Sequence, residues 1–203
     1  WLNRAADKGD PEALYRLGVA YCEGRGVAAD TDKAIAAFRA SSEAYYGAGM
    51  NALGYATALG IGMEADPAEA AQLFASAKTS NFPLGRFNFA VLEETGEGIE
   101  ADPAAARDDY RAAAVGGEMR AAVNLGLMLL EGRGGPADPS EAEKWMRMAA
   151  DEGNAAAENN LGRMYELGLG VDADTTLARD YYGRAAEQGY QLAQDNLDRL
   201  GPG

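Results

Sequence analysis

The chain has 203 residues, a formal net charge of −14 and no histidine. The acidic balance argues against nucleic acid or anionic lipid as a partner, since both attract basic surfaces. Without histidine the chain cannot build a Ser-His-Asp triad, a Cys-His pair or a histidine-bearing zinc site. The single cysteine, Cys22, rules out an internal disulfide framework. No apolar run approaches the roughly 18 residues of a membrane helix.

A glycine-rich stretch recurs five times along the chain. It reads EGRGVAAD at 23–30, LGIGMEAD at 59–66, TGEGIEAD at 95–102, EGRGGPAD at 131–138 and LGLGVDAD at 167–174, which gives a period of 36 residues. A single copy looks like a phosphate-binding loop, but it lacks the Lys-Ser/Thr ending of one. Because a nucleotide site does not recur at a fixed period, the stretch indicates a repeated structural unit.

The two ends of the chain are expected to hold partial repeats. Trp1 shares its register with Trp145, four periods later, so residues 1–9 are expected to end a preceding repeat and the chain to start within a longer protein. Five complete repeats are then expected at 10–45, 46–81, 82–117, 118–153 and 154–189, followed by a C-terminal partial repeat or cap at 190–203. The unbroken period predicts one elongated domain.

Each repeat is expected to contain two helices. In the repeat at 10–45, Leu14, Leu17 and Tyr21 lie on one face of a first helix, which ends at a glycine in the left-handed conformation. Asp30 is expected to cap the second helix by accepting hydrogen bonds from free backbone N–H groups. The buried stripe of the second helix is expected at Ala34, Phe38 and Ser41 here, and at Ala142, Met146 and Ala149 in the fourth repeat.

The later repeats strengthen this assignment. Proline follows the capping aspartate at Pro67, Pro103 and Pro139, in the first helical turn, where it is favoured. Glu69 and Glu141 lie three residues after their aspartates, which is the spacing of a capping box. Small residues share one first-helix position and are expected to let neighbouring helices approach closely: Ala13, Gly49, Gly85, Ala121 and Ala157.

The second and third repeats depart most from the pattern. Thr57 and Glu93 stand where the first and fifth repeats have tyrosine, at Tyr21 and Tyr165. Tyr45 and Asn81 stand where other second helices end in glycine. These repeats are therefore either structurally relaxed or specialised.

The whole unit resembles a known repeat. The pattern A-x-x-N-L-G-x-x-Y-x-x-G-x-G-V-x-x-D, continued by A-x-x-W/Y-x-x-A-A-x-x-G, is similar to the Sel-one-like repeat (SLR), a relative of the tetratricopeptide repeat, and 157–189 is the best copy. The resemblance covers essentially the whole chain. It implies an all-α fold, a right-handed α-solenoid of stacked antiparallel helix pairs with a 36-residue period, which acts as a protein-interaction scaffold.

The resemblance also implies where a ligand would bind. In tetratricopeptide repeats the first helices line the concave face, and the residue before the Leu-Gly pair often contacts a peptide. The matching positions are Arg16, Ala52, Asn88, Asn124, Asn160 and Asn196. An amide donates and accepts at once, which suits a peptide backbone. The alternative is that each asparagine bonds a neighbouring repeat and only locks the stack.

Two further rows flank these asparagines. They are Val19, Tyr55, Val91, Leu127 and Arg163 on one side and Tyr15, Asn51, Phe87, Val123 and Asn159 on the other. The predicted partner-binding set is Tyr15, Tyr55, Phe87, Asn88, Val91, Asn124, Leu127, Asn160 and Arg163. Its apolar members would anchor a peptide or helix, or else pack between repeats. Arg107 is on a second helix, outside the expected groove, and Arg107→Glu is expected to leave partner capture unchanged.

The leading functional hypothesis is a non-catalytic scaffold or adaptor, without cofactor or metal, that binds a protein or peptide segment in the groove and can regulate it. DADTT at 172–176 resembles the start of a calcium loop but lacks its glycine and terminal glutamate. One alternative is an enzyme of the penicillin-binding or β-lactamase-like SLR branch, although that branch is cysteine-rich and no Ser-x-x-Lys motif is evident here. Another is a spacer for a catalytic domain outside this chain. The composition indicates a bacterial source and leaves the cytoplasm and the periplasm open.

Overall fold

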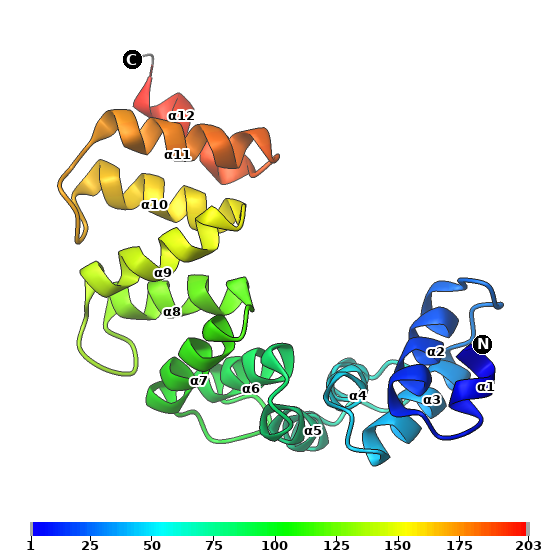
Figure 1. The fold of residues 1–203 in the computed structure, drawn as a ribbon. Helices are drawn as coiled ribbons and strands as arrows, with labels where there is room; N and C mark the ends of the chain where they lie inside the picture. Colours follow the sequence, from blue (N-terminus) through cyan, green and yellow to red (C-terminus); the bar gives the residue numbers. More distant parts are fainter. Residues whose placement is uncertain (1, 202–203) are drawn as a thin grey trace. The chain divides into compact units, whose positions relative to one another are not determined.

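The computed structural model describes residues 2–201, which form twelve α-helices and no strand. Figure 1 shows them as successive helix hairpins. Their bounds are α1 Leu2–Ala6, α2 Pro11–Glu23, α3 Thr31–Glu43, α4 Gly47–Leu59, α5 Pro67–Thr79, α6 Pro83–Thr95, α7 Pro103–Val115, α8 Met119–Glu131, α9 Pro139–Asp151, α10 Ala155–Leu167, α11 Thr175–Glu187 and α12 Gln191–Leu200. The expected place of Trp1, and the last two residues of the expected cap, lie outside the described residues.

The helices group into two compact units, residues 1–109 and residues 110–203. In the first, α2 packs on α3 and α4 on α5, each second helix packs on the next first helix, and α2 contacts α4 as α4 contacts α6. In the second, α8 packs on α9 and α10 on α11, and α9–α10 and α11–α12 contacts join the pairs. Contacts between elements close in sequence are those of an α-solenoid, so the predicted all-α solenoid is confirmed.

The glycine-rich stretches form turns, as predicted. The leading glycines end the five first helices in the left-handed region, with φ between 66° and 77°. The following aspartates cap the second helices, and their Oδ1 atoms accept from first-turn N–H groups at 2.8–3.1 Å. Asp66, for example, accepts from Ala68 and Glu69. Backbone geometry and helix capping thus account for the recurrence of these residues.

The predicted capping boxes at Glu69 and Glu141 are wrong, however. The backbone N–H of each capping aspartate is already donated across the turn, that of Asp138 to the carbonyl of Leu129 at 2.8 Å. Glu141 therefore accepts elsewhere, from the Trp145 indole at 3.1 Å. The turn closes through the backbone, so the glutamate side chain is free for other contacts.

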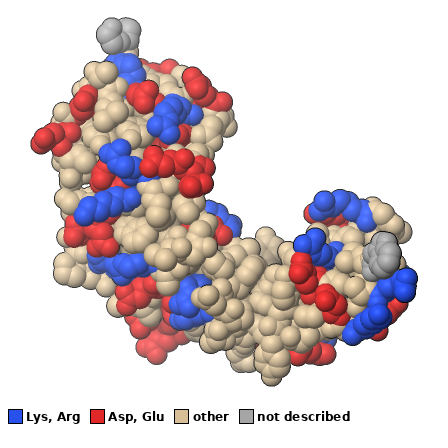
Figure 2. Space-filling model, in the orientation of Figure 1, with Lys and Arg blue, Asp and Glu red and all other residues tan. Residues whose placement is uncertain are grey.

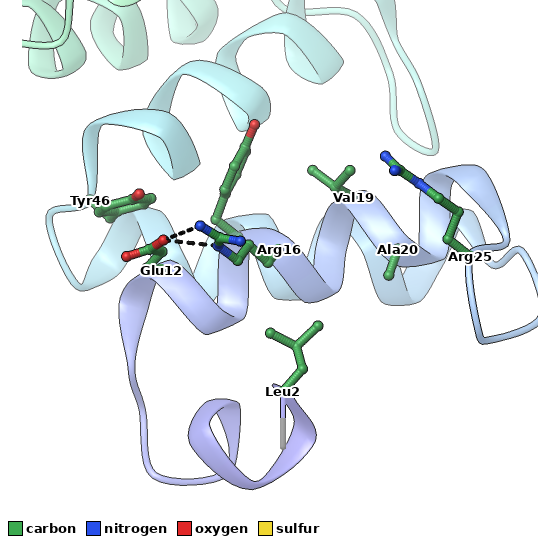
Figure 3. Close-up of a pocket in the computed structure, with 8 residues that line it drawn as sticks. Leu2, Glu12, Arg16, Val19, Ala20, Arg25 and Tyr46 are labelled. Carbon is green, nitrogen blue, oxygen red and sulfur yellow. Dashed lines mark hydrogen bonds and ion pairs between the residues drawn. The ribbon is translucent and has the colours of Figure 1, made fainter.

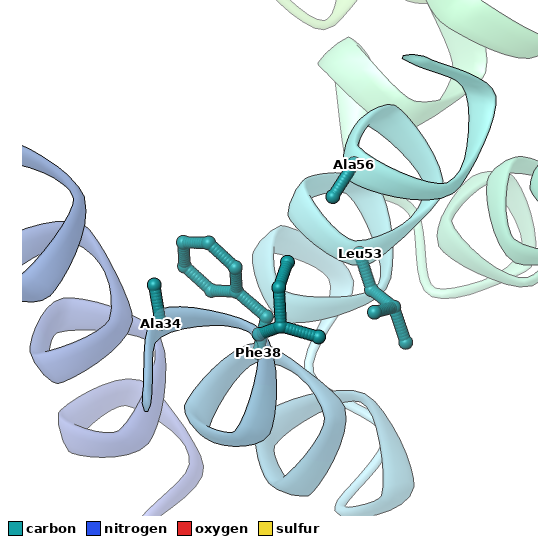
Figure 4. Close-up of a cluster of buried hydrophobic side chains, with 5 residues drawn as sticks. Ala34, Phe38, Leu53 and Ala56 are labelled. Carbon is teal, nitrogen blue, oxygen red and sulfur yellow. The ribbon is translucent and has the colours of Figure 1, made fainter. Parts of the chain in front are cut away.

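A close approach of the two helices builds the core of each pair. The glycine of the Leu-Gly pair packs directly under a large second-helix side chain, and a Cβ atom on Gly162 would lie 2.6 Å from the Tyr182 ring. The matching contact in the first pair is Gly18 under Phe38. Figure 4 shows Phe38 with its cluster, which also holds Ala34, Ile35, Leu53 and Ala56. The predicted buried stripes of the second helices are confirmed.

The outer side of the second helices is a row that recurs with the period and is exposed in every pair: Ala36, Gln72, Asp108, Lys144 and Asp180. Arg107 lies beside this row but is only 9% exposed and has interactions of its own. A glutamate at this position would place a negative charge in a buried site, so Arg107→Glu would disturb folding and is a poor control for binding. Its expected neutrality for partner capture stays a prediction.

We expect Gly162→Ala to destabilise the protein by about 1–3 kcal/mol, since its Cβ would overlap the Tyr182 ring in a well-packed core. Gly183→Ala is the matched control. It lies in the middle of α11 with open space at its Cβ, so alanine should stabilise by about 0.5–1 kcal/mol. Urea denaturation of both variants measures the difference, and equal effects at the two sites would contradict the close-approach account.

Tyr45 sits in the left-handed region with φ of 58° and is 83% exposed. A non-glycine side chain is disfavoured there by about 1–2 kcal/mol. Glycine removes this strain but loses more conformational entropy on folding, which offsets part of the gain. We expect Tyr45→Gly to stabilise the protein by about 0.5–1 kcal/mol in thermal or urea unfolding. Asn81→Gly, at the same φ in the next pair, should gain less because asparagine tolerates this conformation. A loss of stability in Tyr45→Gly would show that the ring makes a contact worth more than the strain.

Candidate functional site

The predicted partner-binding residues lie on the first helices and differ in exposure. Tyr55 and Arg163 are exposed, and the rest are half-buried: Tyr15, Phe87, Asn88, Val91, Asn124, Leu127 and Asn160. Three residues of the flanking rows, Asn51, Val123 and Asn159, are buried. The first-helix face, as we call the surface of α2, α4 and α6 in one unit and of α8, α10 and α12 in the other, is therefore accessible only in part.

Two of the asparagines are held by the repeat that precedes them. The Asn88 side-chain amide donates to the Oδ1 atom of Asn51 at 2.7 Å, and Asn196 donates in the same way to Asn159 at 2.9 Å. The partner is a buried side chain 37 residues earlier in each case. These two asparagines lock adjacent first helices together, which is the structural alternative that the sequence left open.

Asn124 and Asn160, which lie between Asn88 and Asn196 in this row, have no such partner. The residue 37 positions before Asn124 is Phe87, and the one before Asn160 is Val123, and neither has a polar side chain. Neither side-chain amide has a hydrogen-bond partner within residues 2–201, and both asparagines are half-buried. Asn124 and Asn160 therefore keep both donor and acceptor capacity for a ligand.

An apolar pocket of about 160 Å³ opens on the first-helix face of the N-terminal unit. Its lining residues come from α4, α5, α6 and the turn after α6: Tyr55, Ala58, Leu59, Pro67, Ala70, Phe74, Asn88, Val91, Leu92 and Glu97. The pocket brings together the predicted residues Tyr55, Asn88 and Val91. It adds Leu59, which sequence analysis missed although the thirteen residues of α4 contain no charge. That uncharged helix was the available signal.

A wider cavity, of about 510 Å³, lies beside Tyr15 between α1 and α2. Figure 3 shows Leu2, Val19 and Tyr46 around it, with Glu12 paired to Arg16. The Tyr15 ring lies 6.0 Å from the Phe38 ring and 5.9 Å from that of Tyr46, so it is partly a core residue. Arg25, which also lines the cavity, pairs with Glu23. This cavity therefore offers no unpaired charge to a ligand.

The family model for the Sel1 repeat matches the chain six times, at residues 1–10, 11–46, 47–82, 84–114, 120–154 and 155–190. The chain belongs to the Sel1 repeat family. Sel1 repeat proteins are typically non-catalytic scaffolds for protein interactions. No sequence match was found among curated proteins. None of the helices in residues 2–201 is both long and apolar enough to cross a membrane.

Solved structures of bacterial proteins share this architecture. One is c5321, a protective antigen of uropathogenic Escherichia coli with an SLR fold, which matches with a TM-score of 0.90 and 30% identity. The match covers 98% of this chain but only 43% of the length of c5321. A Sel1 repeat protein from Oxalobacter formigenes has a TM-score of 0.89 and 25% identity, with coverage of 96% of this chain and 80% of that one. The immunity protein Pa5087 from Pseudomonas aeruginosa shares the fold alone. It is 21% identical, with a TM-score of 0.59, and the match covers 90% of this chain and 67% of that protein.

One Sel1 repeat departs from the others by burying two carboxylates. In the last complete repeat Tyr165 and Tyr181 stack, with ring centroids 5.7 Å apart, and Arg147 donates to both hydroxyls. Two periods earlier the same two positions hold Glu93 and Asp109, which are 7% and 6% exposed. An acid pair thus replaces an aromatic pair.

Two cations partly compensate this buried pair. Lys78 forms ion pairs with both carboxylates, at 3.5 Å to Glu93 and closer to Asp109, and Arg86 bonds Asp109 at 2.9 Å. The Glu93 Oε2 atom is buried without a hydrogen-bond partner. Burial, followed by the charge of Asp109, raises the pKa of Glu93 to about 7. The pair therefore holds a proton through most of the acidic range.

The raised pKa of Glu93 predicts that folding stability falls as the pH rises from about 4.5 to about 7, because the folded state keeps a proton that the unfolded state has lost. Glu93→Gln removes this loss. At about 1.4 kcal/mol for a pKa difference of one, the rise from 4.5 to about 7 corresponds to roughly 3 kcal/mol, so we expect the variant to be more stable than the wild type by about 3 kcal/mol near pH 8 and by less than about 1 kcal/mol near pH 5. Urea unfolding at both pH values measures the effect. Glu97→Gln, which removes an exposed carboxylate, is the control, and an equal pH dependence in both variants would contradict the prediction.

Proposed function

We propose that this chain is a non-catalytic scaffold that holds a segment of another protein along its first-helix face. The observation that carries the proposal is the pair of half-buried amides of Asn124 and Asn160, which no other side chain or backbone group uses within the described residues. Groups of this kind are ready to hydrogen-bond a peptide backbone. Membership of a family of interaction scaffolds supports the same function.

The spacing on each helix supports the binding of an extended segment. Asn124 and Leu127 are three residues apart on α8, and Asn160 and Arg163 repeat that spacing on α10. Residues three apart are neighbours on a helix surface, so each helix offers an amide beside a second contact. The amides would hydrogen-bond the main chain of any segment, whereas Leu127 and Arg163 would contact its side chains and determine sequence specificity.

Site-specific crosslinking tests the proposal. A photoreactive amino acid at Arg163, which is exposed on a first helix, is compared with one at Lys144, which is exposed on the outer row of a second helix. In a bacterial lysate we expect protein adducts from position 163 and none from position 144. Adducts from position 144 alone would place the partner on the outer row, and no adduct from either position would contradict a scaffold function.

Asn124→Ala should weaken the crosslinked partner's binding about fivefold, since one hydrogen bond contributes about 1 kcal/mol. Asn196→Ala is the informative comparison, because its amide is already bonded to Asn159 and its loss should lower stability more than affinity. Isothermal calorimetry with the identified partner gives the affinities, and thermal unfolding gives the stabilities. Equal affinity losses in the two variants would show that the unpaired amide has no special part in binding.

A further inference from the structure

Helix α4 carries no charged residue, and its two exposed side chains, Tyr55 and Leu59, are both large and hydrophobic, in a chain whose formal net charge is −14. Among the described residues seven large hydrophobic side chains are exposed, and three of them, Tyr55, Leu59 and Ile61, lie within one short stretch at the end of α4. Figure 2 shows the surface over α4 and α5 as mostly tan, with few charged atoms. A concentrated apolar surface on a soluble helix marks an interaction site more often than isolated apolar residues do.

The size and apolar lining of the pocket beside α4 suit a single side chain. Its lining combines buried Phe74 and Ala70 of α5 with the apolar side chains of Tyr55 and Leu59 of α4 and Val91 of α6. Its volume of about 160 Å³ is below the roughly 300–1,000 Å³ usual for small-molecule sites. A cavity of about 150 Å³ can hold benzene. The pocket therefore suits a single leucine, methionine or phenylalanine side chain.

The polar atoms at the pocket favour a peptide with a positive charge. Asn88 uses its amide nitrogen on Asn51, so its oxygen remains as an acceptor for a backbone N–H. Glu97 is the single charged residue in the lining, is exposed and forms no ion pair within the described residues. No cation lines the pocket. An acidic edge without a counter-ion is complementary to lysine or arginine.

We propose that the pocket binds a segment of a partner protein in which one apolar side chain fills the cavity and a nearby lysine or arginine pairs with Glu97. The inference rests on the proposed scaffold function and adds the chemistry of its partner. The buried side chain supplies most of the affinity, and the ion pair, being exposed, contributes more to the choice of sequence than to strength.

Selection from a random-peptide display library against the whole chain tests this inference. We expect selected peptides to share an apolar residue followed closely by lysine or arginine. One selected peptide, made synthetically with a fluorophore, is then measured against variants. Tyr55→Ala should weaken binding about 30-fold, the usual size of a central anchor effect. Because Tyr55 is 56% exposed, this variant should keep the wild-type unfolding temperature.

Charge reversal gives the sharpest comparison. Glu97→Lys should lose the basic peptide and bind better a version of it with glutamate in place of the cation. Glu152→Lys changes the net charge equally on an exposed residue outside the N-terminal unit, and should leave binding unchanged. Equal losses in the two variants would show that only long-range charge matters and would overturn the assignment of Glu97.

Other outcomes separate this inference from the scaffold function. Peptides that bind normally to Tyr55→Ala but weakly to Asn124→Ala would overturn the pocket and keep the scaffold. A library that yields no peptide would overturn the pocket, while crosslinking from position 163 would still test the scaffold. A concentration-dependent dimer in sedimentation that Tyr55→Ala abolishes would assign the pocket to a second copy of the chain and overturn the peptide proposal.

Discussion

The close approach of two helices at a single glycine underlies the rest of this structure. Because Gly162 has no side chain, the Tyr182 ring can approach the helix backbone closely, and the same contact recurs as Gly18 with Phe38. The second helix then fills the space that a side chain would have taken. A helix pair built this way is still too thin to bury its other faces, so its stability depends on neighbouring pairs. Stacking follows from this geometry.

Stacking at a constant period places equivalent residues of successive repeats in rows along the first helices. Where an asparagine of such a row meets a polar residue of the flanking row in the preceding repeat, as Asn88 meets Asn51, its amide nitrogen is used to hold the stack together. Where the preceding residue is apolar, the same asparagine keeps its capacity for a ligand. The difference between a structural and an available amide is therefore set by a residue in the repeat before it.

The third repeat shows how far one unit can depart from the pattern. Glu93 and Asp109 occupy positions that hold stacked tyrosines in the last complete repeat, and Lys78 and Arg86 compensate only part of the resulting charge. Two carboxylates out of water are costly unless they share a proton. A solenoid tolerates this because its contacts are local, so the cost stays within a small part of the chain.

The sequence by itself determined the helix pairs, their turns and their caps, since each depends on residues close together in the chain. The period located the left-handed glycines and the capping aspartates, because φ preference and N–H acceptance are local properties. Only the tertiary structure decided which residues of a row are accessible. It buried Arg107, joined Asn88 to Asn51 and exposed Leu59 at the edge of a pocket. Those outcomes depend on contacts between residues from different helices, which no local pattern specifies.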